Sequence, residues 1–364
     1  MISNDRARER PPFLRDAPLR DLGDAPYLYP TFRQALLDYL SQIPRGAVLM
    51  PDYVPQGVHD PYRRAGWEIA FYPVAASLAL DREAIARALD ARRPDHVVLI
   101  HHFGVYIEEN VRLARELLPA GTALLEDFAH SLPQDDVPVR GDLAAYSSTK
   151  MLGVAEGARL VLRGEARAAP CRYAPEDAAS RALRSRLERR LAFESFFAAR
   201  DLPRVADSAM RRLLRRRAEY YGYVQENYSE IRARIGSRSR TMLERIDLVR
   251  VAERRRKIAR LYVEGLDPRL LLPVPRESLI RQALYAFPIL VADRTAFMAG
   301  MRRRGVRASA LVDHWWFQAE EPGHELRDRH VLLPANHYLS DVKVRRVIEA
   351  ANEAARSPHV SRGA

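Results

Sequence analysis

Residues 123–131 read ALLEDFAHS, an apolar run that ends abruptly in two carboxylates, Glu126 and Asp127, with His130 three residues further on. Short apolar runs bounded by turn residues recur in this part of the chain, at 47–50, 69–72, 97–100, 123–125, 143–147 and 159–162. Helical spacing predicts helices among them at 31–40, 81–89 and 108–118, with Asp81 as an N-cap. This alternation predicts an α/β fold with a mostly parallel central sheet flanked by helices, which binds ligands at the carboxyl ends of its strands.

The remaining segments differ from this α/β part in composition and in the spacing of their apolar residues. From about residue 176 to 235 the sequence is helical and rich in arginine, and from residue 284 it returns to an α/β pattern. There we expect a strand at 284–292 and helices at 295–304 and 341–354. We therefore predict four parts: an N-terminal arm over 1–29, a large domain over 30–170, an arginine-rich helical insertion over 171–240 and a smaller C-terminal α/β domain over 241–364.

The charge of the chain needs an explanation, because 364 residues carry a net charge of +12. Such an excess raises nucleic acid or an anionic membrane as a partner. No DNA-binding motif accompanies the basic segment, and a solvated face on a packed helix explains it more simply, so nucleic acid is not expected. No apolar run approaches the ~20 residues of a membrane span, and the N-terminus lacks an apolar signal core. We expect a cytoplasmic protein. A single cysteine, Cys171, excludes an internal disulfide and a cysteine-based metal site, and we predict no metal.

Lysine is rare in this sequence, since only three of the 59 basic residues are lysines. Arginine can replace lysine in salt bridges but does not become an amine nucleophile, so each remaining lysine is informative. Lys150 follows the strand at 143–147 and a cluster of hydroxyl side chains. Taken singly, Lys150 could be a surface lysine, Asp127 a helix cap or a buried ion-pair partner, and His130 a structural histidine. Together they suggest pyridoxal 5′-phosphate (PLP), which needs a lysine for its Schiff base and an acid at its pyridine nitrogen.

These residues belong to a larger set of motifs that resembles the DegT/StrS-type aminotransferases. That family comprises fold type I PLP enzymes that install amino groups on nucleotide-linked keto sugars. The resemblance covers most of the chain and is weakest between residues 168 and 235. Its motifs, in chain order, are VLMP at 48–51, AG at 65–66, HHFG at 101–104, EDFAH at 126–130, GD at 141–142, STKMLGVAEG at 148–157, RRRKIARLY at 254–262, LPANHYLS at 333–340 and VIEA at 347–350.

The resemblance implies a role for several residues. Lys150 would form the Schiff base and shuttle the substrate proton, and Asp127 would pair with the pyridine nitrogen. His130 falls where the family places a glutamine or histidine near the hydroxyl group of the cofactor. Thr31 and Arg33 stand at the start of a helix where the family binds the phosphate through backbone N–H groups, the helix dipole and charge-assisted hydrogen bonds.

Around the cofactor, the sequence departs from the family pattern at two phosphate-side positions. Phe32 stands where the family has a glycine, which allows a close backbone approach to the phosphate. Ala145 stands where the family commonly has a phosphate-binding serine. Ser147 and Ser148 are the candidates to replace that serine.

Further departures concern the aromatic ring that stacks on the cofactor and the substrate pocket. Pro55 occupies the usual place of that aromatic residue, and Tyr53 is the candidate to replace it. Asn336 stands where a histidine is frequent, and we include it among the substrate candidates. His101 and Tyr146 are two more candidates for the substrate pocket.

The resemblance implies a PLP-dependent aminotransferase that acts as a homodimer, with active sites at the subunit interface. An amino acid, with glutamate as the expected donor, would convert the cofactor to its amine form, which would then aminate a keto sugar that is nucleotide-linked. One alternative is a PLP enzyme acting on a non-sugar keto substrate. Another is a non-catalytic scaffold of the family with an altered phosphate site. Relatives that dehydrate sugars have histidine in place of the lysine, so Lys150 argues against dehydration.

Overall fold

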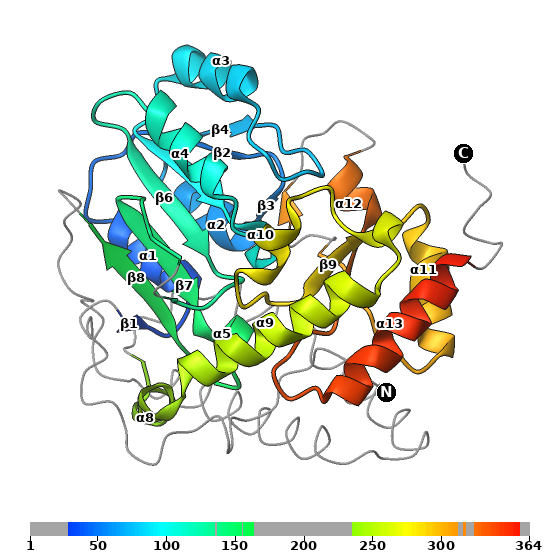
Figure 1. Ribbon diagram of the computed structural model, residues 1–364. Coiled ribbons are helices and arrows are strands. Elements are labelled where there is room, and N and C mark those ends of the chain that lie inside the picture. The colour runs from blue at the N-terminus through cyan, green and yellow to red at the C-terminus, as the bar shows by residue number, and fades with distance from the viewer. Residues whose placement is uncertain are drawn as a thin grey trace.

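The computed structural model describes residues 28–134, 137–154, 156–163, 235–311, 316–317 and 324–356 (Figure 1). Most of the predicted N-terminal arm and the predicted insertion as far as residue 234 lie outside these ranges. The described residues up to 163 build a large α/β body around one sheet, and the described residues from 235 to 356, called here the C-terminal part, lie beside it (Figure 1).

The central sheet has seven strands in the order β1-β8-β7-β6-β5-β2-β4. Neighbours among β4, β2, β5, β6 and β7 pair in parallel, whereas β8 is antiparallel to β7 and β1 is antiparallel to β8. The strands are β1 (Leu28–Tyr29), β2 (Ala47–Pro51), β4 (Glu68–Tyr72), β5 (His96–Ile100), β6 (Ala123–Phe128), β7 (Leu143–Ser147) and β8 (Ala158–Leu162). The predicted mostly parallel sheet is confirmed. Because β1 pairs with β8, residues 28–29 belong to the sheet and not to the predicted arm.

Helices cover both faces of this sheet, with α4 in front of it and α1 behind it in Figure 1. The large body also contains the two-residue strand β3 (Val54–Pro55), α1 (Phe32–Leu40), α2 (Gln56–Arg64), α3 (Arg82–Arg92), the short 3₁₀ helix η2 (His102–Gly104), α4 (Glu108–Leu117) and α5 (Ser148–Met151). The N-cap prediction for Asp81 is confirmed, since its carboxylate accepts a hydrogen bond from the Ala84 N–H at 2.9 Å. One core layer packs α1 and α2 against the sheet, and the other packs α3 and α4 against its opposite face.

The C-terminal part is built on a two-stranded antiparallel sheet of β9 and β11. Its elements are α8 (Ser237–Arg245), α9 (Leu248–Gly265), η3 (Pro268–Leu270), α10 (Arg276–Ile280), β9 (Phe287–Leu290), α11 (Arg294–Arg303), β10 (Trp316–Phe317), α12 (Glu325–Arg329), β11 (His330–Leu333) and α13 (Asp341–Arg356). The predicted helices at 295–304 and 341–354 are confirmed, and the predicted strand at 284–292 is shorter than expected. The predicted boundary at residue 240 falls inside α8, so this helix is not divided there.

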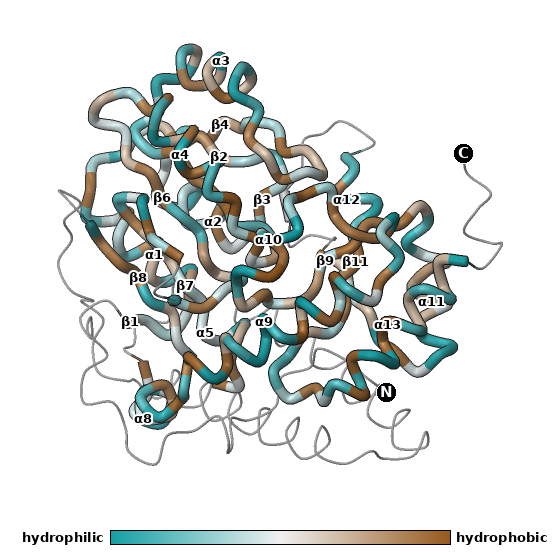
Figure 2. Tube along the Cα trace, in the orientation of Figure 1, coloured by the Kyte–Doolittle hydropathy of each residue, from teal (hydrophilic) through white to brown (hydrophobic). Residues whose placement is uncertain are grey.

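Amphipathic helices close the core of the C-terminal part. Figure 2 shows hydrophobic and hydrophilic residues alternating along α13, which buries Val344, Val347 and Ile348 against α9 and α11. Spacings of three and four residues place these side chains on one helix face. In Figure 1, α9 runs from the neighbourhood of α5 and α8 across to α13, so one helix spans both bodies.

Candidate active site

The candidate site lies where β6 and β7 end, next to each other in the sheet. These two strands are parallel, and Asp127 on β6 is opposite Ala145 on β7. Parallel strands end at the same edge, so the turn after β6, which carries His130, lies beside α5, which carries Lys150. The sheet topology thus brings together residues that lie twenty positions apart in the sequence.

Lys150 and His130 are in direct contact, with Nζ of the lysine 3.2 Å from Nε2 of the histidine. Lys150 is half-buried, whereas His130 is buried. Burial, together with the charges of Lys150 and His102, holds the pKa of His130 well below its usual 6.5. The imidazole is therefore neutral near pH 7. To accept a hydrogen bond from the amine, it must carry its proton on Nδ1.

Asp127 provides a carboxylate in the same neighbourhood. It is 3% exposed, and Oδ1 accepts a hydrogen bond from the Ala129 N–H at 2.7 Å. Burial raises the pKa of Asp127 above its usual value, and the nearby charge of Lys150 acts in the opposite direction. A buried carboxylate is costly unless hydrogen bonds and a cation compensate it, and here both are present.

Hydroxyl groups and the start of α1 adjoin the lysine. Ser147 is buried at the end of β7, with its hydroxyl 3.2 Å from that of Thr149, and Ser148 begins α5. Gly157 has a φ of +144°, and a Cβ atom there would lie 3.2 Å from Cβ of Ser148. The Gly157 N–H donates to the Pro30 carbonyl at 2.9 Å. This bond ties the entry to α1 to the segment that follows Lys150.

Thr31 and Arg33, the predicted phosphate ligands, have partners within the protein. Thr31 caps α1, because its hydroxyl oxygen accepts from the Gln34 N–H at 3.2 Å. The Arg33 guanidinium is buried and lies 3.8 Å from the Asp60 carboxylate. The Phe32 ring packs into the core on this face of the sheet. The binding of a phosphate by Thr31 and Arg33 stays a prediction.

Two predicted substrate residues, His101 and Tyr146, lie on the other face of the sheet from Asp127. Strand residues alternate between faces, and Phe128, the next residue after Asp127, packs against both rings. The ring centroids of His101 and Phe128 are 4.2 Å apart, and those of Tyr146 and Phe128 are 5.0 Å apart. His101 Nε2 is 2.9 Å from Oε2 of the fully buried Glu126. Through these contacts His101 and Tyr146 belong to the packed layer between the sheet and α4.

Tyr53 and Asn336, the other two predicted site residues, are buried and hydrogen-bonded within the protein. The Tyr53 ring is fully buried between His102, at 5.7 Å, and His324, at 5.4 Å, and its hydroxyl donates to the Leu311 carbonyl. A cofactor could stack on this ring only by displacing one of the histidines. Asn336 is buried, and its side-chain oxygen accepts from the Tyr338 N–H at 3.1 Å.

Tyr285, which the sequence patterns did not indicate, contacts the candidate site directly. Its ring stacks on the His130 imidazole with centroids 5.0 Å apart and planes 19° from parallel. Its backbone N–H donates to the His130 carbonyl at 3.0 Å. Tyr285 falls inside the predicted apolar strand at 284–292, and no periodicity distinguishes it from a core aromatic residue.

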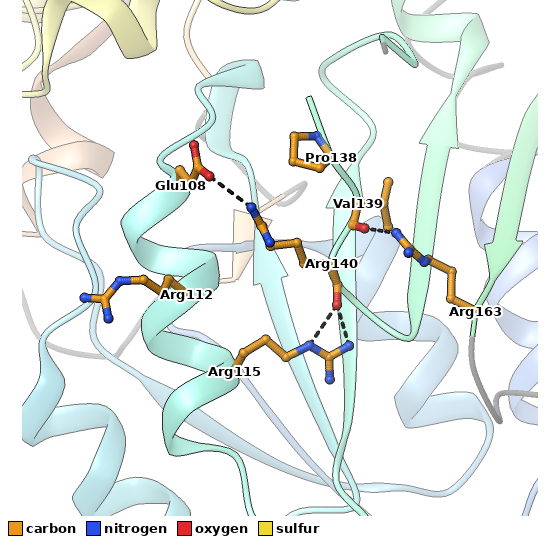
Figure 3. A pocket seen from close by; sticks show the side chains of 7 residues that line it. All are labelled: Glu108, Arg112, Arg115, Pro138, Val139, Arg140 and Arg163. Atoms are coloured by element: carbon orange, nitrogen blue, oxygen red, sulfur yellow. Dashed lines mark hydrogen bonds and ion pairs between the residues drawn. The ribbon is translucent and has the colours of Figure 1, made fainter. Parts of the chain in front are cut away.

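A surface groove of about 570 Å³ lies away from this site, at the amino end of β7 (Figure 3). Its lining residues are Glu108, Arg112, Arg115, Pro138, Val139, Arg140 and Arg163. The arginines there bind protein acceptors. Arg140 contacts Glu108 at 3.1 Å, Arg115 donates to the Arg140 carbonyl at 2.8 Å, and Arg163 donates to the Val139 carbonyl (Figure 3). The groove is therefore not the candidate site.

Neither a candidate membrane-spanning helix nor a metal-binding cluster occurs in the described ranges. No helix there has the length and apolar character needed to cross a membrane. The same residues contain no group of three or more histidine, cysteine, aspartate or glutamate side chains that could hold a metal ion.

Comparison with solved structures shows that the chain has the fold of PLP-dependent aminotransferases. The sugar aminotransferase CalS13 from Micromonospora echinospora is 17% identical, over 97% of this chain and 100% of that chain, with a TM-score of 0.60. A DegT/DnrJ/EryC1/StrS aminotransferase from Brucella abortus is 17% identical, over 91% and 86%, with a TM-score of 0.55. Spr1654 from Streptococcus pneumoniae, solved in its PLP form, is 12% identical, over 90% and 86%, with a TM-score of 0.58. Neither a family model nor a curated protein sequence matches the chain. At these identities the similarity establishes the fold alone.

Proposed function

We propose that the protein is a PLP-dependent aminotransferase that transfers an amino group from an amino acid, with glutamate as the expected donor, to a nucleotide-linked keto sugar. The observation that carries this proposal is the contact between the Lys150 amine and the His130 imidazole, with the buried Asp127 carboxylate on the neighbouring strand end. The fold supports it, because the solved structures described above are aminotransferases.

The chemistry of these side chains fits PLP. The half-buried Lys150 amine suits the aldehyde, the buried Asp127 carboxylate suits the pyridine nitrogen, and the capped start of α1 suits the phosphate. When bound, PLP supplies an electron sink for the substrate carbon. Asp127 would hold the pyridine nitrogen, with Ser147 and Ser148 beside the lysine.

Lys150 and His130 would handle the proton in this reaction. Nζ of Lys150 would move the proton between the substrate carbon and the bound cofactor. The lowered pKa of His130 keeps the imidazole neutral near pH 7, so it would accept a hydrogen bond from Nζ without taking the proton. This hydrogen bond would fix the direction of the amine.

The substrate class, assembly and location belong to the same proposal. CalS13 is a sugar aminotransferase, and the motifs from residue 48 to 350 resemble a family that acts on nucleotide-linked keto sugars. We propose a homodimer with active sites at the subunit interface, in the cytoplasm. We also propose a PLP-binding large domain over 30–170 and a smaller C-terminal α/β domain over 241–364.

Reduction of the protein with borohydride in the presence of PLP tests the proposal. We expect a visible absorption band before reduction and, after it, a PLP adduct on Lys150 in the peptide map. The band and the adduct should be lost in Lys150→Ala and retained in Lys257→Ala, which removes an exposed lysine paired with Asp341 at 2.8 Å. Glutamate added to the loaded protein should bleach the band. The absence of both band and adduct would support a non-catalytic scaffold instead.

A further inference from the structure

A segment of the C-terminal part crosses the candidate site just before β9. Tyr285 lies on this segment and makes two contacts with His130, through its ring and through its backbone N–H. The ring is only half-buried, and it packs against both the core of the C-terminal part and the cluster that contains Met151 and Leu152. Tyr285 therefore covers one face of the imidazole whose edge contacts Lys150.

This close approach depends on Gly104, at the end of η2. Its φ is +91°, and a Cβ atom there would lie 2.3 Å from the His130 carbonyl oxygen and 3.3 Å from Cα of Leu284. Any side chain would therefore push apart the His130 turn and the segment that carries Tyr285. Glycine allows three chain segments to meet at this point.

Arg255, on α9, fixes the Tyr285 segment relative to the lysine. Its guanidinium is buried and donates to the carbonyls of Leu284 at 2.8 Å and Tyr285 at 3.2 Å. The same group donates to the carbonyl of Met151, the residue after Lys150, at 2.7 Å. One rigid, planar side chain thus joins both sides of the Lys150–His130 contact.

We propose that Tyr285 is a positioning residue, held by Arg255, that fixes the His130 imidazole as the hydrogen-bond acceptor for Lys150. The inference rests on the proposed function, in which Lys150 is the reacting amine. The stacked ring excludes water from one imidazole face and restricts rotation of the imidazole. The titratable groups that face His130 are Lys150 from α5, His102 from η2 and Tyr285. The positive charge of Lys150 disfavours a proton on Nε2, and exclusion of water by Tyr285 acts in the same direction.

The first test measures His130 itself, by NMR of the full-length, cofactor-free protein with labelled histidines. His130→Gln assigns its signals among the ten histidines. We expect the Nδ1–H tautomer in the wild type, with no protonation between pH 5 and 8. Tyr285→Ala should raise the pKa of His130 by about one unit or more, because water reaches the ring. Tyr285→Phe should keep the wild-type value, and Arg255→Lys should shift it in the same direction as Tyr285→Ala.

Phe71→Ala is the matched control, since Phe71 stacks on His59 at 6.2 Å on the edge strand β4. It should leave the signals of His130 unchanged. Circular dichroism checks folding, and Tyr285→Leu replaces Tyr285→Ala if that variant does not fold. A wild-type His130 with its proton on Nε2 would overturn the proposal without any variant, and so would a folded Tyr285→Ala with an unchanged pKa.

A second readout separates this proposal from the proposed function. The rate at which PLP becomes reducibly attached to Lys150 should fall by roughly threefold or more in Tyr285→Ala and recover in Tyr285→Phe. Expected histidine shifts in a protein that forms no PLP adduct would refute the proposed function and leave the positioning role intact. Normal adduct formation in all variants, with unchanged histidine signals, would refute the positioning role of Tyr285 and leave the proposed function intact.

Discussion

Substitution of Glu126 should destabilise the protein strongly, because this carboxylate organises the core beside the candidate site. It is 0% exposed, and it accepts hydrogen bonds from His101 at 2.9 Å, from the Arg140 N–H at 2.7 Å and from the Gly141 N–H. Glu126→Ala leaves these three donors without their acceptor. Each buried, unsatisfied donor costs about 1–3 kcal/mol, and water can reach the one near the exposed Arg140 side chain. We therefore expect a loss of about 3–5 kcal/mol in the free energy of unfolding.

Urea denaturation followed by circular dichroism measures this loss. Glu126→Gln keeps the volume and one acceptor oxygen, so we expect a smaller loss of about 1.5–3 kcal/mol. Glu109→Gln is the control, because its carboxylate is exposed and pairs with the exposed Arg112, and we expect no measurable change. A free energy of unfolding for Glu126→Ala within about 1 kcal/mol of the wild type would refute the reasoning.

The same carboxylate gives a pH dependence of known sign. Burial alone would raise the pKa of Glu126, but the hydrogen bonds from His101 and from the two backbone N–H groups outweigh it and hold the pKa below 4.5. A folded-state pKa below the unfolded value contributes stability that is fully present well above pH 4.5 and is lost as the pH falls through the folded pKa. Glu126→Gln should lack this part of the acid dependence.

Three further predictions concern the site and its acid sensitivity. Gly104→Ala should lower the melting temperature and the yield of PLP adduct far more than Gly121→Ala. Both glycines have a positive φ, but only at Gly104 would the added Cβ lie 2.3 Å from the His130 carbonyl oxygen. Equal melting temperatures of the two variants would contradict this prediction. Asp127→Asn should reduce the rate of the single-turnover reaction with glutamate by roughly a hundredfold or more, measured by bleaching of the PLP band, and a smaller effect would remove Asp127 from the pyridine nitrogen. Burial lowers the pKa of His102 to about 4, so the unfolded chain binds more protons than the folded chain between about pH 4 and 6.5. Stability should therefore decrease as the pH is lowered through that window, and His102→Gln should reduce the slope in urea titrations.

The sheet and the place of Lys150 directly after β7 could be predicted because local signals determine them. The strand at 143–147 has the bounds predicted for it, and Asp81 and Thr31 cap the helices that follow them. Once β6 and β7 are recognised as neighbouring parallel strands, the positions of Asp127 and Lys150 follow from their places at the strand ends.

Helix α2 could not be predicted, because its sequence contains both Gly57 and Pro61. Glycine and proline are ordinarily turn signals. Pro61 is tolerated because it removes only one intrahelical hydrogen bond, while Val58 and Tyr62 are buried on the same helix face. Tertiary packing outweighs local propensity here.

The placement of Tyr146 depended on strand register, which the sequence alone does not give. In the structure Tyr146 is the partner of Phe128 and not of Asp127, so its ring follows Phe128 to the α4 face. A shift by one residue would have placed it on the other face. The same uncertainty affected His101, whose partners Glu126 and Phe128 lie on β6.

The contacts of Arg255 and Tyr285 could not be predicted from the sequence, because they join segments that lie far apart in the chain. Arg255 lies about a hundred residues from Met151, yet its guanidinium donates to the Met151 carbonyl and to the segment that covers His130. Lys150 and its histidine acceptor therefore cannot be fully positioned until α9 and the C-terminal part have docked on the sheet. A movement of that part relative to the sheet would alter the Lys150–His130 contact, because one planar guanidinium spans both sides of it. In the proposed enzyme, substrate contacts made by the C-terminal part would thus be transmitted to the reacting amine through Arg255 and Tyr285.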